Sequence, residues 1–124
     1  MSNDKEINMQ VFARNAGTNM MFPAGTVIFK EGETGKNVYI VQSGMIEIVT
    51  HDKVVDTCGP NEALGFMPLI DGGLHTASAR VRDSAELSVL DERQFRFMID
   101  EVPNFAMYIM KALAHRIRGL RDSI

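Results

Sequence analysis

The chain has 124 residues, a net charge of −3 at neutral pH and 45% hydrophobic residues, which suits one globular domain with a single core. This charge gives no overall attraction to nucleic acid or to an anionic membrane surface, and no apolar run approaches the roughly 18 residues of a membrane span. A single cysteine, Cys58, excludes an internal disulfide. Because residues 1–10 also lack the pattern of a signal peptide, we expect a cytoplasmic protein.

The first predicted element is a short helix over residues 4–13. Ile7, Val11 and Phe12 form a narrow apolar stripe at helical spacing, and the small residues 15–17 end the helix. We expect this helix to pack as a lid on the strands that follow.

Residues 18–90 read as a series of short strands separated by turns. The apolar runs are rich in β-branched and aromatic residues, and Gly, Pro, Asn and Asp gather between them. Ser43-Gly44 is expected to separate two strands, and residues 51–53 form a hairpin turn. Strands at this spacing, without helices between them, favour a sandwich or barrel over alternating strand–helix units. The expected strands cover 20–22, 27–29, 38–41, 45–49, 54–58, 76–79 and 85–90.

The chain is organised around residues 64–81. A glycine interrupts an apolar run, about one helical turn follows, and Asp71-Gly72-Gly73 forms a turn. A strand of small residues, 76–79, comes next. The free backbone N–H groups at the start of a short helix favour negative charge, so this stretch is a candidate anion site.

Two helices are predicted after residue 90. Asp91 and Gln94 form a capping box, and Leu90 and Phe95 a hydrophobic staple. The second helix is expected to begin with Pro103 at its first position. The inward face of the first helix is predicted to contain Phe95, Met98, Ile99 and Val102.

Apolar residues of the last helix are spaced four and three apart, as in the seam of a helix pair. We therefore expect a homodimer through this helix, although so short a seam also suits packing on the protein's own barrel. Phe105, Ile109 and Ala112 widen the stripe, so that one face can pack on the strands. Basic residues near the end suit the helix dipole and are expected to be solvated or to pair across the dimer. The predicted seam consists of Ala106, Met110, Leu113, Ile117 and Leu120.

Taken together, these segments resemble the cyclic-nucleotide-binding domain family, in the form of the effector domain of catabolite-activator-type regulators standing alone. The resemblance rests on turn glycines at 25, 32 and 44 and on residues 65, 69–73 and 77–79, which match the family's phosphate-binding cassette. It implies a mainly β fold with flanking helices, namely a jelly-roll-like double-stranded β-helix barrel. The implied domain occupies residues 1–124, with the β-roll at about 18–90 and the C-terminal helices at about 91–122.

The resemblance also implies a ligand site, but its two anchoring residues are replaced. The family's ribose-binding Glu falls on Phe66 and its phosphate-binding Arg on His75, which is mostly neutral at pH 7 at its ordinary pKa. Losing two charged hydrogen bonds implies roughly 3–6 kcal/mol, or on the order of 10²- to 10⁴-fold in affinity. A cyclic nucleotide therefore stays a candidate ligand only in weakened form. The implied ligand-binding residues are Leu64, Gly65, Phe66, Met67, His75, Thr76 and Ala77.

Two functions follow from these observations. The first is a non-enzymatic regulatory or sensor module with weak or altered binding of a small anionic or nucleotide-like ligand. The alternative is a ligand-free dimerisation or protein-interaction module, in which Phe66 fills a dead pocket.

Catalysis, metal binding and DNA binding are not expected. His51, His75 and His115 lack the spacing of metal ligands, and Ser78 and Ser84 stand in no recognisable nucleophile motif. The related regulators place a helix-turn-helix after the long helix, where this sequence stops, so we expect no nucleic-acid partner.

Overall fold

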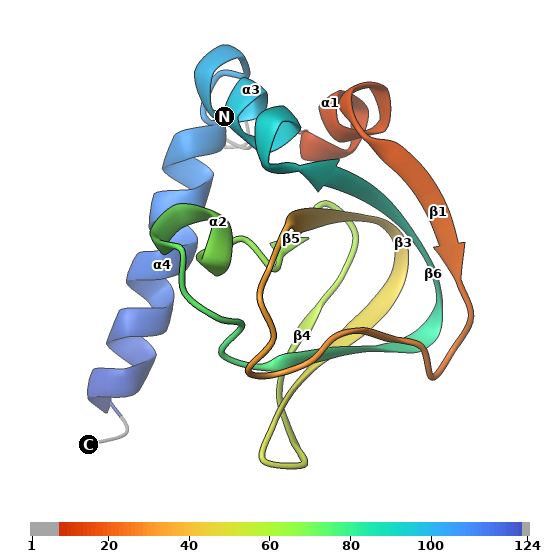
Figure 1. The fold of residues 1–124 in the computed structure, drawn as a ribbon, viewed down its shortest axis with the longest axis vertical. Coiled ribbons are helices and arrows are strands. Elements are labelled where there is room, and N and C mark those ends of the chain that lie inside the picture. The colour runs from red at the N-terminus through yellow and green to blue at the C-terminus, as the bar shows by residue number, and fades with distance from the viewer. Residues whose placement is uncertain (1–7, 123–124) are drawn as a thin grey trace, which may run out of the picture.

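The computed structural model describes residues 8–122, with side chains described as far as residue 118. Its strands form one antiparallel sheet in the order β1-β6-β3-β4, with β2 paired to β6 and β5 to β3. The sheet curls around itself, with α1 and α3 at one end and α4 along one side (Figure 1). In chain order the elements are α1 (Met9–Ala16), β1 (Thr18–Phe22), β2 (Val27–Phe29), β3 (Asn37–Thr50), β4 (Lys53–Cys58), β5 (Ala63–Leu64), α2 (Met67–Asp71), β6 (Ser78–Asp91), α3 (Glu92–Glu101) and α4 (Phe105–Asp122).

The mainly β jelly-roll class with flanking helices is therefore as predicted. The described strands do not close into a complete hydrogen-bonded barrel, because β1 and β4 stand at the two ends of the strand order.

Two long strands replace four of the predicted short ones. β3 and β6 each have 14 residues and run through the positions where breaks were expected. The pairing of β3 with β6 shifts register on both sides of Ser43. Gly44 has φ +91°, and a Cβ there would lie 2.5 Å from the Ser84 carbonyl oxygen. This glycine thus bends the strand by a bulge instead of ending it.

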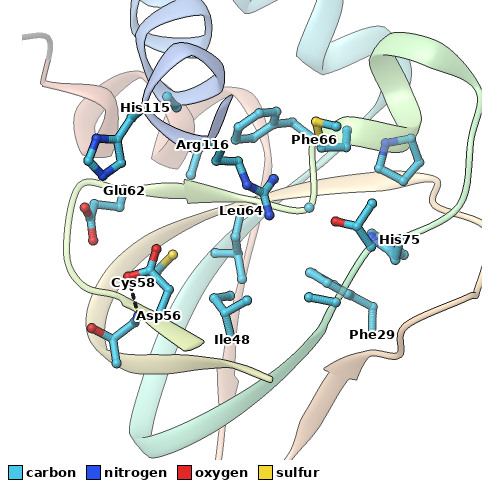
Figure 2. A pocket seen from close by; sticks show the side chains of 18 of the residues that line it. Phe29, Ile48, Asp56, Cys58, Glu62, Leu64, Phe66, His75, His115 and Arg116 are labelled. Atoms are coloured by element: carbon cyan, nitrogen blue, oxygen red, sulfur yellow. Dashed lines mark hydrogen bonds between the residues drawn. The ribbon is translucent and has the colours of Figure 1, made fainter. Parts of the chain in front are cut away.

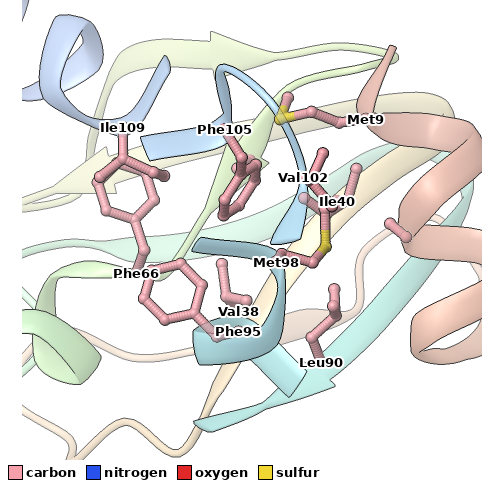
Figure 3. Packing of buried hydrophobic residues seen from close by; sticks show 12 residues of the cluster. Met9, Val38, Ile40, Phe66, Leu90, Phe95, Met98, Val102, Phe105 and Ile109 are labelled. Carbon is pink, nitrogen blue, oxygen red and sulfur yellow. The ribbon is translucent and has the colours of Figure 1, made fainter. Parts of the chain in front are cut away.

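Hydrophobic side chains form two clusters instead of the single core expected from length. The first lies between the helices and one end of the sheet, and Figure 3 shows Phe66 in it beside Phe95 and Ile109. The second lies inside the curl of the sheet and includes Phe29, Leu64 and Leu87. The side chain of Phe66 therefore connects the cassette with the helices that cover it.

The prediction for the first helix was wrong in its extent and its face. α1 runs from Met9 to Ala16, three residues beyond the predicted end at residue 13; residues 4–7 lie outside the described part of the chain. Met9 and Ala13 are its buried residues, whereas Val11 and Phe12 are 53% and 43% exposed. Two hydrogen bonds fix this orientation, because the Gln10 amide donates to the Gln42 carbonyl at 2.9 Å and the Gln42 amide to the Gln10 carbonyl at 2.8 Å.

The capping box at the start of α3 is confirmed. The Gln94 N–H donates to Asp91 Oδ1 at 2.8 Å, and the Asp91 N–H donates to Gln94 Oε1 at 2.9 Å. The last helix, however, begins at Phe105 and not at Pro103. Asn104 has φ +69°, so the backbone leaves the helical path just after the proline.

Candidate functional site

A cavity of about 410 Å³ lies between the cassette and α4. Its volume falls within the usual range for small-molecule pockets, roughly 300–1,000 Å³. The cassette supplies one wall with residues 64–68 and 75–77, and α4 supplies another with Lys111, Ala112, His115 and Arg116. All seven residues that the resemblance implied for the ligand site line this cavity: Leu64, Gly65, Phe66, Met67, His75, Thr76 and Ala77.

The turn into the cassette needs a glycine. Gly65 has φ +81°, and a Cβ at this position would lie 3.0 Å from Cε2 of Phe29. The chain then enters α2, which ends when the Gly72 N–H donates to the Pro68 carbonyl at 2.9 Å. α2 is only five residues long, so its N-terminus gives little dipole for binding an anion.

Phe66 stands where a ribose-binding carboxylate was implied, and its ring is only 5% exposed. It packs in the first hydrophobic cluster with Phe95 and Ile109 and at the same time borders the cavity. An apolar ring accepts no hydrogen bond from a hydroxyl group, so this position contributes shape and no polar recognition.

His75 stands where a phosphate-binding arginine was implied, and it is 6% exposed. Its ring is stacked on Phe29, with centroids 3.9 Å apart. Burial lowers the pKa of His75, and the nearby Glu33 opposes this effect only in part. The imidazole is therefore neutral at pH 7 and does not replace the charged fork of an arginine.

The cations of α4 are the site residues that sequence reasoning missed. Arg116 extends from the helix toward the middle of the cavity, between Glu62 on one side and His75 on the other (Figure 2). Lys111 and Arg116 are exposed to solvent, as expected, but they also line the cavity, which the sequence did not indicate. Helical periodicity could have predicted this position. Arg116 follows the buried Ile109 by seven residues, or two helical turns, and therefore lies on the same face of α4.

A hydrogen bond ties α4 to the edge of the cassette. The Ala63 N–H in β5 donates to the Tyr108 hydroxyl at 3.0 Å. Since Ala63 directly precedes Leu64 and Gly65, any displacement of α4 at Tyr108 acts on the strand that leads into the cavity.

Comparison with known proteins decides the family. The sequence model of the family described as "Cyclic nucleotide-binding domain" matches residues 20–102. This chain belongs to the cyclic nucleotide-binding domain family. It is 32% identical over 103 residues to the Cyclic AMP receptor protein of Thermus thermophilus, covering 79% of this chain and 48% of that protein. It is 27% identical over 108 residues to the CRP-like cAMP-activated global transcriptional regulator of Mycobacterium tuberculosis, covering 83% and 48%.

The fold comparison agrees with the sequence comparison. The crystal structure of Thermus thermophilus Catabolite Activator Protein superposes with a TM-score of 0.80 at 29% identity, covering 93% of this chain and 57% of that one. The chain spans about half the length of the curated relatives it matches. It is thus a regulatory cyclic nucleotide-binding domain of the catabolite-activator type.

Within this cyclic nucleotide-binding domain, Arg80 does not replace the missing cassette arginine. As strand parity predicts, its side chain lies away from the cavity. Arg80 Nη2 pairs there with Glu47 Oε1 on β3 at 2.8 Å.

The domain's one cysteine, Cys58, also lines the cavity. Burial raises the pKa of the Cys58 thiol to about 12, with smaller effects from Glu62 and Asp56, so Cys58 is not a thiolate at neutral pH. Among residues 8–122, no three His, Cys, Asp or Glu side chains are grouped so as to hold a metal ion. In the same part of the chain, no helix has the length and hydropathy needed to cross a membrane.

Proposed function

We propose that this domain is a non-catalytic sensor whose cavity binds a small anionic ligand and whose affinity for cyclic nucleotides is weakened. One observation carries the proposal: the same cavity is walled by the cassette and by α4. A ligand in it would contact both walls, so its affinity would differ between positions of α4. Binding would therefore shift the population of those positions.

The weakened nucleotide affinity rests on two residues. Phe66 presents an apolar ring, and His75 is buried and neutral. Each of these two residues stands in place of one that would form a charged hydrogen bond worth about 1.5–3 kcal/mol. A dissociation constant in the micromolar range would therefore become millimolar or weaker.

We also propose that the domain forms a homodimer through α4. Met110 and Ile117, both in the predicted seam, are 53% and 59% exposed. Ala106 is half-buried, and Leu113 packs against the first hydrophobic cluster, so it serves the domain's own core. The side chain of Leu120 lies outside the described part of the structure. The dimer surface would accordingly centre on Met110 and Ile117.

Calorimetric titration with cAMP and cGMP, from micromolar to millimolar concentration, tests the proposal. We expect dissociation constants in the millimolar range, together with slower amide hydrogen exchange in α4 when a ligand is bound. Micromolar affinity would contradict the weakened site. Binding without any change in α4 exchange would contradict the sensor mechanism.

A double variant, Phe66→Glu with His75→Arg, supplies the matched comparison. It restores both implied anchors and should bind cyclic nucleotide more tightly than the wild type. Because Phe66 is in the core, the folded state of this variant must first be verified by its melting temperature.

The burial of Phe66 favours a second function, a ligand-free dimerisation or protein-interaction module. Ala112 lines the cavity and is half-buried, so Ala112→Phe would fill the space beside it. In a sensor this variant abolishes the response of α4 to ligand. In a ligand-free module it leaves dimerisation and stability close to those of the wild type.

A further inference from the structure

The polar groups around the cavity differ in whether they already have partners. Glu62 Oε1 accepts from the Gly59 N–H at 2.6 Å, and Asp56 Oδ1 accepts from the Thr57 N–H at 2.8 Å. The side chain of Arg116 forms no hydrogen bond or ion pair with any residue that the structure describes. Among the described residues that line the cavity, Arg116 and Lys111 are the cationic side chains, both exposed to solvent, and only Arg116 presents a planar fork of donors.

The helix that carries this guanidinium is anchored at two points. It is held to the cassette side by the Tyr108 hydroxyl and by the burial of Ile109. The Arg116 charge opposes in small part the rise in the pKa of the neighbouring Cys58 thiol, at the end of β4. Arg116 extends toward the middle of the cavity, between Glu62 and His75, as Figure 2 shows.

The rest of the wall is largely apolar. The side chains of Ile48, Leu64 and Phe66 border the cavity, and Phe29 with its stacked His75 forms the side away from Glu62. A polyhydroxylated sugar would meet no carboxylate acceptor at Phe66 and no charged fork at His75. An apolar group placed against Ile48, Leu64 and Phe66 would be removed from water without covering a polar side chain of these three residues.

We propose that the ligand of this cavity is a small hydrophobic monoanion, an aryl or alkyl carboxylate, and that Arg116 binds its carboxylate. The inference rests on the proposed sensor function and names its ligand class. The planar guanidinium donates two parallel hydrogen bonds to the carboxylate, and the apolar part of the ligand lies against Leu64, Ile48 and Phe66. The bound ligand then links α4, through the ion pair with Arg116, to the cassette, through apolar contacts with Leu64 and Phe66.

Calorimetry on the full chain tests this assignment with phenylacetate, benzoate and octanoate, each paired with its neutral amide. Cyclic AMP and inorganic phosphate are titrated alongside. We expect at least one carboxylate to bind more than tenfold more tightly than its amide and than inorganic phosphate, because only the acid can form the charged pair.

Variants of α4 then assign the contact. Arg116→Ala should weaken carboxylate binding about 10- to 100-fold, and Arg116→Lys roughly three- to tenfold, since lysine keeps the charge but loses the fork. Arg118→Ala is the matched control, because Arg118 is exposed on the same helix and does not line the cavity. It should bind like the wild type.

The outcomes separate the inference from the function on which it rests. Equal binding of acids and amides, or acid binding that Arg116→Ala leaves unchanged, overturns the inference alone. Millimolar binding of cAMP with no binding of any carboxylate also overturns only the inference. Micromolar binding of cAMP overturns the proposed weakened site and the ligand class together.

Discussion

The imidazole of His75 lies flat on the ring of Phe29, with 3.9 Å between centroids and 9° between planes. Burial in this stack lowers the pKa of His75 from its ordinary value of 6.5. Below pH 6.5 the imidazole of His75 takes up a proton in the unfolded chain, whereas in the folded protein it stays neutral to a lower pH. The folded state therefore keeps its full stability above about pH 6.5 and loses stability as the pH falls through that value.

Urea unfolding at about pH 7.5 and about pH 5.5 measures this effect. The wild type should lose more stability between the two conditions than His75→Phe, which keeps a stacked ring but cannot titrate. His51 and His115 are common to both proteins and cancel in the comparison. An equal loss in the two proteins would contradict a role for His75.

Truncation of Phe66 should be costly because its ring belongs to the first hydrophobic cluster. Phe66→Ala is expected to lower the free energy of unfolding by about 3–5 kcal/mol in urea titrations. Phe97, which is 56% exposed on α3, gives the matched control, and Phe97→Ala should change it by less than about 1 kcal/mol. Similar losses in the two variants would show that Phe66 is not a core residue.

The capping box of α3 predicts a smaller effect. Asp91→Ala removes the acceptor of the Gln94 N–H and should cost about 1 kcal/mol of stability. Asp91→Asn keeps an acceptor oxygen and should cost a few tenths of that amount. Chemical unfolding of both variants provides the measurement, and equal stability of Asp91→Ala and the wild type would rule out the cap as a stabilising contact.

Cys58 should be inert in the folded protein. Its pKa of about 12 leaves little thiolate at about pH 8, so the reaction with a chromogenic disulfide reagent should be slow. The same reaction in concentrated guanidinium chloride should be fast, because unfolding fully exposes the half-buried thiol to water. Rapid reaction under native conditions would show that the thiol is accessible and ionised.

The proposed dimer predicts the effect of charges on α4. Met110→Asp combined with Ile117→Asp should turn a dimer into a monomer in sedimentation measurements, because both side chains are exposed in the single chain. Their exposure also means that monomer stability should change little. Val55→Asp, at a 60% exposed position on β4, is the control and should leave the dimer intact. A dimer that survives the double substitution would place the interface elsewhere.

Local signals accounted for much of the fold. The hairpin turn at His51 and Asp52 has φ of +52° and +66°, as a tight turn between antiparallel strands requires, and its short polar residues indicated it. The capping box at Asp91 is equally local, since both hydrogen bonds join residues three apart. Such features depend little on the rest of the chain.

Features that depend on distant contacts were harder to predict. Gly44 looks like a strand break in sequence, but the backbone of Ser84 and Ala85 lies against it and keeps the strand paired. The role of Arg116 depends on which face of α4 meets the sheet, and that is decided by the burial of Phe105 and Ile109. The departures at Phe66 and His75 were visible in the sequence, whereas the open cavity between them and α4 was not.

The continuity of β3 has a consequence for how the domain comes apart. This strand gives Val38 and Ile40 to the cluster under the helices, and Val41 and Ile46 to the cluster inside the sheet. β6 likewise gives Leu90 to the first and Leu87 to the second. Separation of these two strands would disrupt both clusters at once, which couples the clusters in unfolding. A change of packing beside α4 therefore acts on β3 and β6, the same two strands that supply the cluster inside the sheet.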